Sequence, residues 1–144
     1  MNKMELRFSA SLENQAFART SIASFMMSLN PSIEEIDEVK TIVSEAVSNA
    51  IIHGYQKNKE KFVYLKACID KNAILITIQD YGIGIEDINK VMEDYYTTKK
   101  DEEHAGMGFT IMKAFSDNFE IYSTPNLGTK IVLVKLINHQ LIPQ

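Results

Sequence analysis

The sequence predicts an α+β fold, in which a mixed, mostly antiparallel sheet and a layer of helices on one of its faces form a two-layer sandwich. Two observations lead to this prediction. Two helical patterns come early in the chain, and adjacent strand patterns joined by short turns follow them. Strands joined by short turns pair antiparallel, and helices bury their apolar side against such a sheet. The 144 residues suit one domain with one main core.

Composition and charge favour a globular cytoplasmic protein. Hydrophobic residues make up 45% of the chain, and no stretch approaches the ~18 apolar residues that would indicate a membrane span. The first residues lack the apolar centre of a signal peptide, and Cys68, the single cysteine, excludes an internal disulfide. The net charge of −4 argues against a nucleic-acid surface. We therefore expect neither a nucleic-acid partner nor a membrane.

The first half of the chain predicts one strand and two helices. Apolar and polar residues alternate over residues 4–8, which is typical of a strand with one solvent-facing side. Residues 12–29 carry a helical stripe of apolar residues. Ser32 should cap a second helix, with Glu35 as its capping-box partner. That helix should run to Gly54, a residue typical of helix C-caps.

The second half predicts mainly strands. Residues 61–70 and 73–80 read as a pair joined by a short polar turn, and both faces of the second strand look largely buried. Residues 86–105 are charged and weakly periodic, which indicates a flexible lid. The remaining elements that we expect are a helix over 108–117 and a hairpin of strands 119–124 and 129–137.

The strand that ends at Asp80 is followed by two glycines, Gly82 and Gly84. Asp and Gly are the commonest turn residues, so a plain turn is one interpretation. The other is that the glycines let the backbone approach a ligand closely. The carboxylate would then accept a hydrogen bond from that ligand, for which the amino group of an adenine is a suitable donor.

A carboxylate and an amide are set into the second helix, which is apolar almost all round. Glu45 and Asn49 are four residues apart and so share one helical face. Burying an ionised carboxylate without partners is costly, so something polar should meet Glu45. It pairs with a lysine in a purely structural interpretation. In the functional one, Asn49 binds Mg²⁺ and Glu45 orients or deprotonates a nucleophile.

A third stretch predicts phosphate contacts. Gly106 and Gly108 stand where the last helix should begin, and a helix N-terminus offers free N–H groups to an anion. Thr98 and Lys99, just upstream, are suitable donors to phosphate oxygens. A lone GxG before a helix is weak evidence, so this prediction depends on the other two stretches.

Together the three stretches resemble the nucleotide-binding domain, of the Bergerat type, shared by gyrase-type ATPases, ninety-kilodalton heat-shock chaperones, mismatch-repair ATPases and histidine kinases. The resemblance implies ATP as the ligand. It covers roughly residues 32 to 135. The matching positions are Glu45-xxx-Asn49 for the N box, Asp80-x-Gly82-x-Gly84 for the first glycine box and Gly106-x-Gly108 for the second, with Phe109 and Thr129 also at nucleotide-contacting positions.

The stretches "VSEAVSNAIIHGY", "TTK" and "GMGFTIM" narrow the resemblance to the anti-sigma serine kinases. This implies a homodimer that inhibits a sporulation sigma factor when loaded with ATP and Mg²⁺. It also implies phosphorylation of a serine on an anti-anti-sigma protein. Two alternatives stay open, namely a non-catalytic module that uses ATP to shape its surface, and an ATPase or histidine-kinase catalytic domain. His53 ends a helix, where we expect it to be solvated or locally hydrogen-bonded.

The protein surfaces can be assigned only as hypotheses. Arg19 flanks the apolar stripe of the first helix, where it is either a solvated flank residue or the partner of an acidic residue of the sigma factor. The first strand, if its edge is exposed, is a candidate for the dimer contact.

Overall fold

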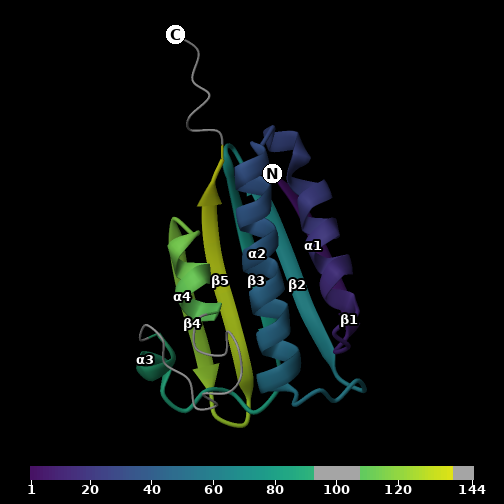
Figure 1. Cartoon of the computed structure of the whole chain (residues 1–144), viewed down its shortest axis with the longest axis vertical. Helices are drawn as coiled ribbons and strands as arrows, with labels where there is room; N and C mark the ends of the chain where they lie inside the picture. Colours follow the sequence, from purple (N-terminus) through teal and green to yellow (C-terminus); the bar gives the residue numbers. More distant parts are fainter. Residues whose placement is uncertain (93–107, 138–144) are drawn as a thin grey trace.

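A computed structural model describes residues 1–92 and 108–137, and Figure 1 shows a sheet with helices on one face. The strands occur in the order β1-β2-β3-β5-β4. The strand bounds are β1 (Asn2–Ser9), β2 (Phe62–Asp70), β3 (Ala73–Asp80), β4 (Asn118–Thr124) and β5 (Gly128–Leu136). The helix bounds are α1 (Asn14–Phe25), α2 (Ile33–Asn49), α3 (Ile88–Val91) and α4 (Gly108–Ala114). The α+β class and the two layers are as predicted.

All four pairings between the described strands are antiparallel, whereas the prediction allowed a mixed sheet. The connections explain the difference. Two successive helices, α1 and α2, return the chain from the end of β1 to the same end of the sheet, where β2 starts in the opposite direction (Figure 1). Among the described strands β1 pairs only with β2, which agrees with the predicted exposed edge at β1.

The core lies between the helices and one face of the sheet. Ile74, Ile76 and Ile78 of β3 are at most 2% exposed and face α2. Leu75, between them in sequence, is 40% exposed, so the prediction that both faces of this strand are largely buried is wrong. The reason is that the described helices cover only one face, which leaves the alternate side chains of β3 toward the open side (Figure 1). None of the described helices is both long enough and apolar enough to cross a membrane.

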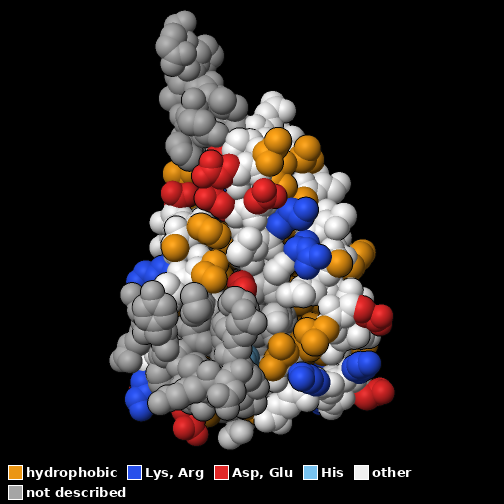
Figure 2. Space-filling model, viewed as in Figure 1, with side chains coloured by type: hydrophobic (Ala, Val, Ile, Leu, Met, Phe, Trp, Pro, Cys, Tyr) orange, Lys and Arg blue, Asp and Glu red, His pale blue; other side chains and the backbone are white. Residues whose placement is uncertain are grey.

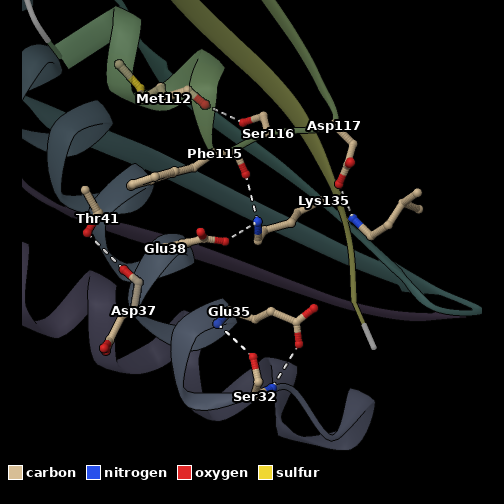
Figure 3. A network of polar contacts seen from close by, with 11 residues as sticks. Ser32, Glu35, Asp37, Glu38, Thr41, Met112, Phe115, Ser116, Asp117 and Lys135 are labelled. Carbon is tan, nitrogen blue, oxygen red and sulfur yellow. Dashed lines mark hydrogen bonds and ion pairs between the residues drawn. The ribbon is translucent and has the colours of Figure 1, made fainter. Parts of the chain in front are cut away.

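The ends of α1 and α2 differ in how well the sequence predicted them. The predicted capping box is present, since Ser32 Oγ accepts from the Glu35 N–H and the Glu35 carboxylate accepts from the Ser32 N–H (Figure 3). The first helix is α-helical only to Phe25 and then tightens into a 3₁₀ turn. The second changes after Asn49 into a π-turn over Ala50–Gly54, so Gly54 is not a C-cap.

The last helix ends at Ala114, three residues earlier than predicted. Two contacts redirect the chain there. Ser116 Oγ donates to the Met112 carbonyl, and the Asp117 N–H joins β5 by donating to the Val134 carbonyl at 2.9 Å. A side chain therefore satisfies the Met112 carbonyl at the end of α4, and the backbone joins the sheet from Asp117 on.

A buried ion pair fastens this end of α4 to the rest of the fold. Lys135, on β5, is 7% exposed, and its Nζ lies 2.8 Å from Glu38 Oε1 on α2 and 2.8 Å from the Phe115 carbonyl oxygen (Figure 3). Alternation along β5 turns Lys135 toward the helices, where an unpaired ammonium group would be costly. The pair therefore links three elements that are distant in sequence.

Candidate functional site

A cavity of about 350 Å³ opens at the end of the sheet where β3 finishes. Its apolar wall comes from Ile78 of β3, Phe109 of α4 and Ile131 of β5. The polar side chains that line it are Asn49, His53, Asp80, Glu86, Asp87, Lys90 and Thr129. Mixed lining of this kind suits a small ligand with a flat apolar part and several polar groups.

Asp80 lies at the buried side of this cavity and is 5% exposed. Loss of solvation on burial raises the pKa of its carboxyl group from 3.8 to about 6, and hydrogen bonds from the Gly82 and Thr129 N–H groups oppose the shift. The Gly82 bond, to Oδ1, is 2.9 Å long. At neutral pH the side chain is therefore an ionised acceptor in a poorly solvated place, which is a suitable partner for a ligand N–H donor.

Gly54 and Gly82 pack closely at this carboxylate. The close approach at Gly82 is to another part of the chain, whereas the prediction was an approach to a ligand. A Cβ on Gly54 would lie 2.7 Å from Asp80 Oδ1, and a Cβ on Gly82 would clash with the Gly54 carbonyl oxygen. These glycines let two protein segments approach each other. Of the glycines predicted around Asp80, Gly84 lines the cavity, and its φ of +75° is one that glycine adopts without strain.

Asn49 closes α2 and lines the cavity from the helical side. His53 lies four residues further along and also lines the cavity, a position that the sequence analysis did not assign to it. The four-residue spacing from Asn49 was the signal that could have found it. Thr129, predicted near the ligand, pairs with Asp80 in the sheet and lies in the cavity wall together with Phe109.

Glu45 lies one turn before Asn49 but lines a different hollow, a groove between α1 and α2. A Cβ on Gly108 would lie 2.9 Å from Glu45 Oε2, so this carboxylate stands beside the first residue of α4. The side chains that line the groove are Arg19, Asp37, Lys40, Thr41, Ser44 and Glu45. Figure 2 shows basic side chains over α1 and α2, on the face of the molecule that carries the helices.

Arg19 is half-buried in this groove, where its Nη1 donates to Ser44 Oγ at 3.3 Å. Gln15, one turn earlier on α1, donates to the Ser44 carbonyl at 2.8 Å. These contacts hold the two helices together and leave the Arg19 guanidinium with further donors. Arg19 and Glu45 therefore line the same groove, and Arg19 does not line the cavity that holds Asp80.

Three predicted phosphate-binding residues, Thr98, Lys99 and Gly106, lie outside the described residues. Within the predicted lid, the described part contains α3, whose Lys90 lines the cavity. No pattern in the sequence distinguishes Lys90 from the other charged residues of this segment. The inward positions Ile78 and Ile131 could have been found from strand alternation alone.

Comparisons with known proteins agree with this arrangement. Residues 8–135 match the Histidine kinase-like ATPase domain family. The chain is 50% identical over 137 residues to an Anti-sigma F factor from Clostridium perfringens (strain SM101 / Type A), covering 95% of this chain and 98% of that protein. It is 47% identical over 134 residues to the Anti-sigma F factor of Bacillus subtilis (strain 168), covering 93% and 92%.

A solved structure of the RsbU and RsbW domains of a Mycobacterium tuberculosis protein shares the fold, with a TM-score of 0.67 at 13% identity. The match covers 95% of this chain and 32% of that one. Fold and cavity together define a histidine kinase-like ATPase domain, a class whose name implies ATP binding. Within this class, the chain belongs to the family of anti-sigma F factors.

Proposed function

We propose that the chain is an anti-sigma factor and a protein serine kinase. In its ATP-bound form it binds and inhibits a sporulation sigma factor, and it phosphorylates a serine of an anti-anti-sigma protein. The observation that carries this proposal is that two side chains of α2, one turn apart, line two different hollows. Asn49 lines the cavity with Asp80, and Glu45 lines the neighbouring groove that is open to a protein partner.

The cavity residues fit an ATP molecule. Asp80 is an ionised acceptor at the buried side, where it would read the amino group of the base, and Ile78 and Ile131 offer apolar surface to the ring. Thr129, beside Asp80, adds a hydroxyl and Phe109 adds an aromatic edge. The phosphates would then extend toward Asn49 and the start of α4.

The donor set at Asn49 also fits Mg²⁺. Mg²⁺ binds oxygen ligands and usually keeps waters and phosphate oxygens, so one amide oxygen from the protein is enough. When bound, the ion would neutralise charge on the transferred phosphoryl group. Thr98, Lys99, Gly106 and Gly108 are proposed to donate to the phosphate oxygens, in keeping with their matching positions in the family.

Glu45 is proposed to act on the incoming hydroxyl group. Phosphoryl transfer to serine requires an acceptor that is oriented and loses its proton as the new bond forms. The Glu45 carboxylate lies beside Gly108 and in the groove, so a hydroxyl that enters from the groove side would meet it before reaching the phosphates. We assign Glu45 the role of general base.

The protein partners are proposed to dock on the helical face. Arg19 in the groove would pair with an acidic side chain of the sigma factor, because its guanidinium keeps donors beyond the one that binds Ser44. The edge strand β1 is the proposed contact of a homodimer, because its outer backbone groups have no partner strand among the described residues. Both partners of the kinase reaction are cytoplasmic in this proposal.

One experiment separates the candidate functions. The purified protein is incubated with γ-labelled ATP, Mg²⁺ and a purified anti-anti-sigma protein, and the product is analysed for phosphoserine. Sigma-factor binding is measured in parallel with and without ATP. Serine phosphorylation together with ATP-dependent sigma binding supports the proposal. ATP-dependent binding without phosphorylation would identify a non-catalytic module, and label on a histidine would identify a histidine kinase.

A further inference from the structure

Tyr55 follows the π-turn at the end of α2 and joins three segments of the chain. It is 7% exposed, and its hydroxyl donates to the Phe62 carbonyl at 2.6 Å and accepts from the Tyr81 N–H at 2.8 Å. Phe62 begins β2, and Tyr81 is the first residue after β3. One hydroxyl therefore connects the end of α2 with the start of one strand and the exit of the next.

The Tyr81 N–H lies where the sheet no longer supplies partners. The pairing of β3 with β2 stops at Gln79, and the pairing with β5 stops at Asp80. A part-buried amide that lacks a partner still costs free energy, and the Tyr55 hydroxyl supplies a partner for this one. The Tyr55 side chain, which follows the π-turn after α2, thus holds the peptide after Asp80.

The same turn also sets the space around the Asp80 side chain. Gly54, the last residue of the π-turn, faces the Asp80 carboxylate, and its carbonyl accepts from the Ile83 N–H at 2.9 Å. Burial raises the pKa of Tyr55, so its hydroxyl keeps its proton and can donate to Phe62 while it accepts from Tyr81. Gly54 therefore lies against the Asp80 carboxylate, and Tyr55 holds the peptide that follows it.

We propose that Tyr55 is a positioning residue for base recognition, whose hydroxyl holds the backbone at Tyr81 and thereby keeps the Asp80 carboxylate where it accepts a hydrogen bond from the amino group of adenine. This inference rests on the proposed binding of ATP at Asp80. Tyr55 does not line the cavity. Its effect on the nucleotide therefore passes through Asp80, and should concern the amino group more than the rest of the base.

The test compares ATP with inosine triphosphate, which carries a carbonyl in place of the amino group. Both are titrated by calorimetry into the parent protein and into Tyr55→Phe, which keeps the ring and removes the hydroxyl. We expect ATP affinity to fall about tenfold in Tyr55→Phe, the equivalent of one lost hydrogen bond to a charged group, while inosine triphosphate affinity stays within about twofold. A residue that only stabilised the fold would leave the ratio of the two affinities unchanged.

Tyr122→Phe is the matched control, because its hydroxyl contacts Glu120 on the outer side of β4 and lies away from the cavity. It should leave both affinities unaltered. If the ratio of ATP affinity to inosine triphosphate affinity is the same in Tyr55→Phe as in the parent, the proposal is overturned. If the parent itself binds the two nucleotides equally, the assignment of Asp80 to adenine fails instead.

Amide hydrogen exchange gives a second measurement, and one of its two readings needs only the parent protein. The Tyr81 amide should exchange slowly there, and at least tenfold faster in Tyr55→Phe, by the loss of a bond worth about 1.4 kcal/mol. Rapid exchange at Tyr81 in the parent would show that the hydroxyl does not hold this peptide. That result would overturn the proposal even if Tyr55→Phe failed to fold.

Discussion

Glu45 and Asn49 lie one turn apart on α2, yet Asn49 lines the cavity that holds Asp80 and Glu45 lines the groove that holds Arg19. In the function that we propose, the helix separates two tasks along its length, with nucleotide binding at its end and action on the protein partner one turn earlier. Substitutions at the two positions should have separable effects.

We predict that Glu45→Gln keeps binding of ATP with Mg²⁺ and inhibition of the sigma factor. Serine phosphorylation should fall by about two or more decades, since a general base contributes about 10²–10⁴-fold. Asn49→Ala is the contrasting variant, which should lose metal-dependent nucleotide binding and with it both activities. Single-turnover phosphorylation and calorimetry measure the two effects. A Glu45→Gln protein that phosphorylates at the parent rate would remove Glu45 from the mechanism.

Asp80→Asn should weaken ATP binding by about tenfold or more. The asparagine amide replaces one acceptor oxygen by an NH₂ group at the place where the amino group of adenine requires an acceptor. The parent protein should also bind ATP more tightly than GTP, whose carbonyl would face the Asp80 carboxylate. Calorimetry with both nucleotides checks this, with Asp117→Asn as a control on a distant carboxylate that accepts from the Leu136 N–H. Equal affinities of the parent for ATP and GTP would contradict the assignment.

The raised pKa of Asp80 predicts how stability depends on pH. Between about pH 4 and pH 6 the folded protein holds a proton that the unfolded chain has released, so the free energy of unfolding falls as the pH rises through this window. The rise of the Asp80 pKa from 3.8 to about 6 corresponds to about 3 kcal/mol as an upper bound. Asp80→Asn lacks this contribution. Urea unfolding of nucleotide-free protein at pH 4.5 and 7.5 should therefore show the variant gaining about 2 kcal/mol relative to the parent at the higher pH. Parallel pH profiles of the two proteins would refute the prediction.

Arg19→Glu should abolish sigma-factor binding and leave ATP binding normal, because Arg19 lines the groove and not the cavity. Reversal of the charge would repel the acidic residue that we propose as its partner. Lys40→Glu, in the same groove, tests whether the effect is specific to Arg19 or follows from the general charge of this surface. Sigma binding that survives Arg19→Glu would place the docking surface elsewhere.

The sequence predicted the parts of this molecule that follow from local patterns. The capping box at Ser32, the strand order along the chain and the gathering of Asn49, Asp80 and Thr129 at one cavity all follow from spacing and from the family resemblance. The π-turn after Asn49 could not be predicted from the sequence, because one extra residue in a helical turn does not change the pattern of an apolar stretch. The partner of Lys135 was equally hidden, since Glu38 is 97 residues away in the chain.

The ion pair between Lys135 and Glu38 leads to a further prediction. Glu38→Ala should lower the free energy of unfolding by about 2–3 kcal/mol, because the Lys135 ammonium group would stay buried with the Phe115 carbonyl as its described partner. Adding Lys135→Met should recover part of that loss by removing the buried charge. Chemical denaturation of the two single variants and the double variant measures the coupling. Additive losses in the double variant would show that the pair does not act as a unit.

The π-turn over Ala50–Gly54 has a consequence for how this chain tolerates insertions and deletions. Successive residues of an α-helix are rotated by about 100°, so an added residue changes the direction in which everything after it points. Glu45 and Asn49 keep the direction set by the start of α2, whereas Gly54 and Tyr55 take the direction that the wider turn allows. Deleting any one residue of this turn should therefore rotate Gly54 and Tyr55 away from their positions beside Asp80. We therefore expect the number of residues between Asn49 and Tyr55 to matter for this site as well as their identity.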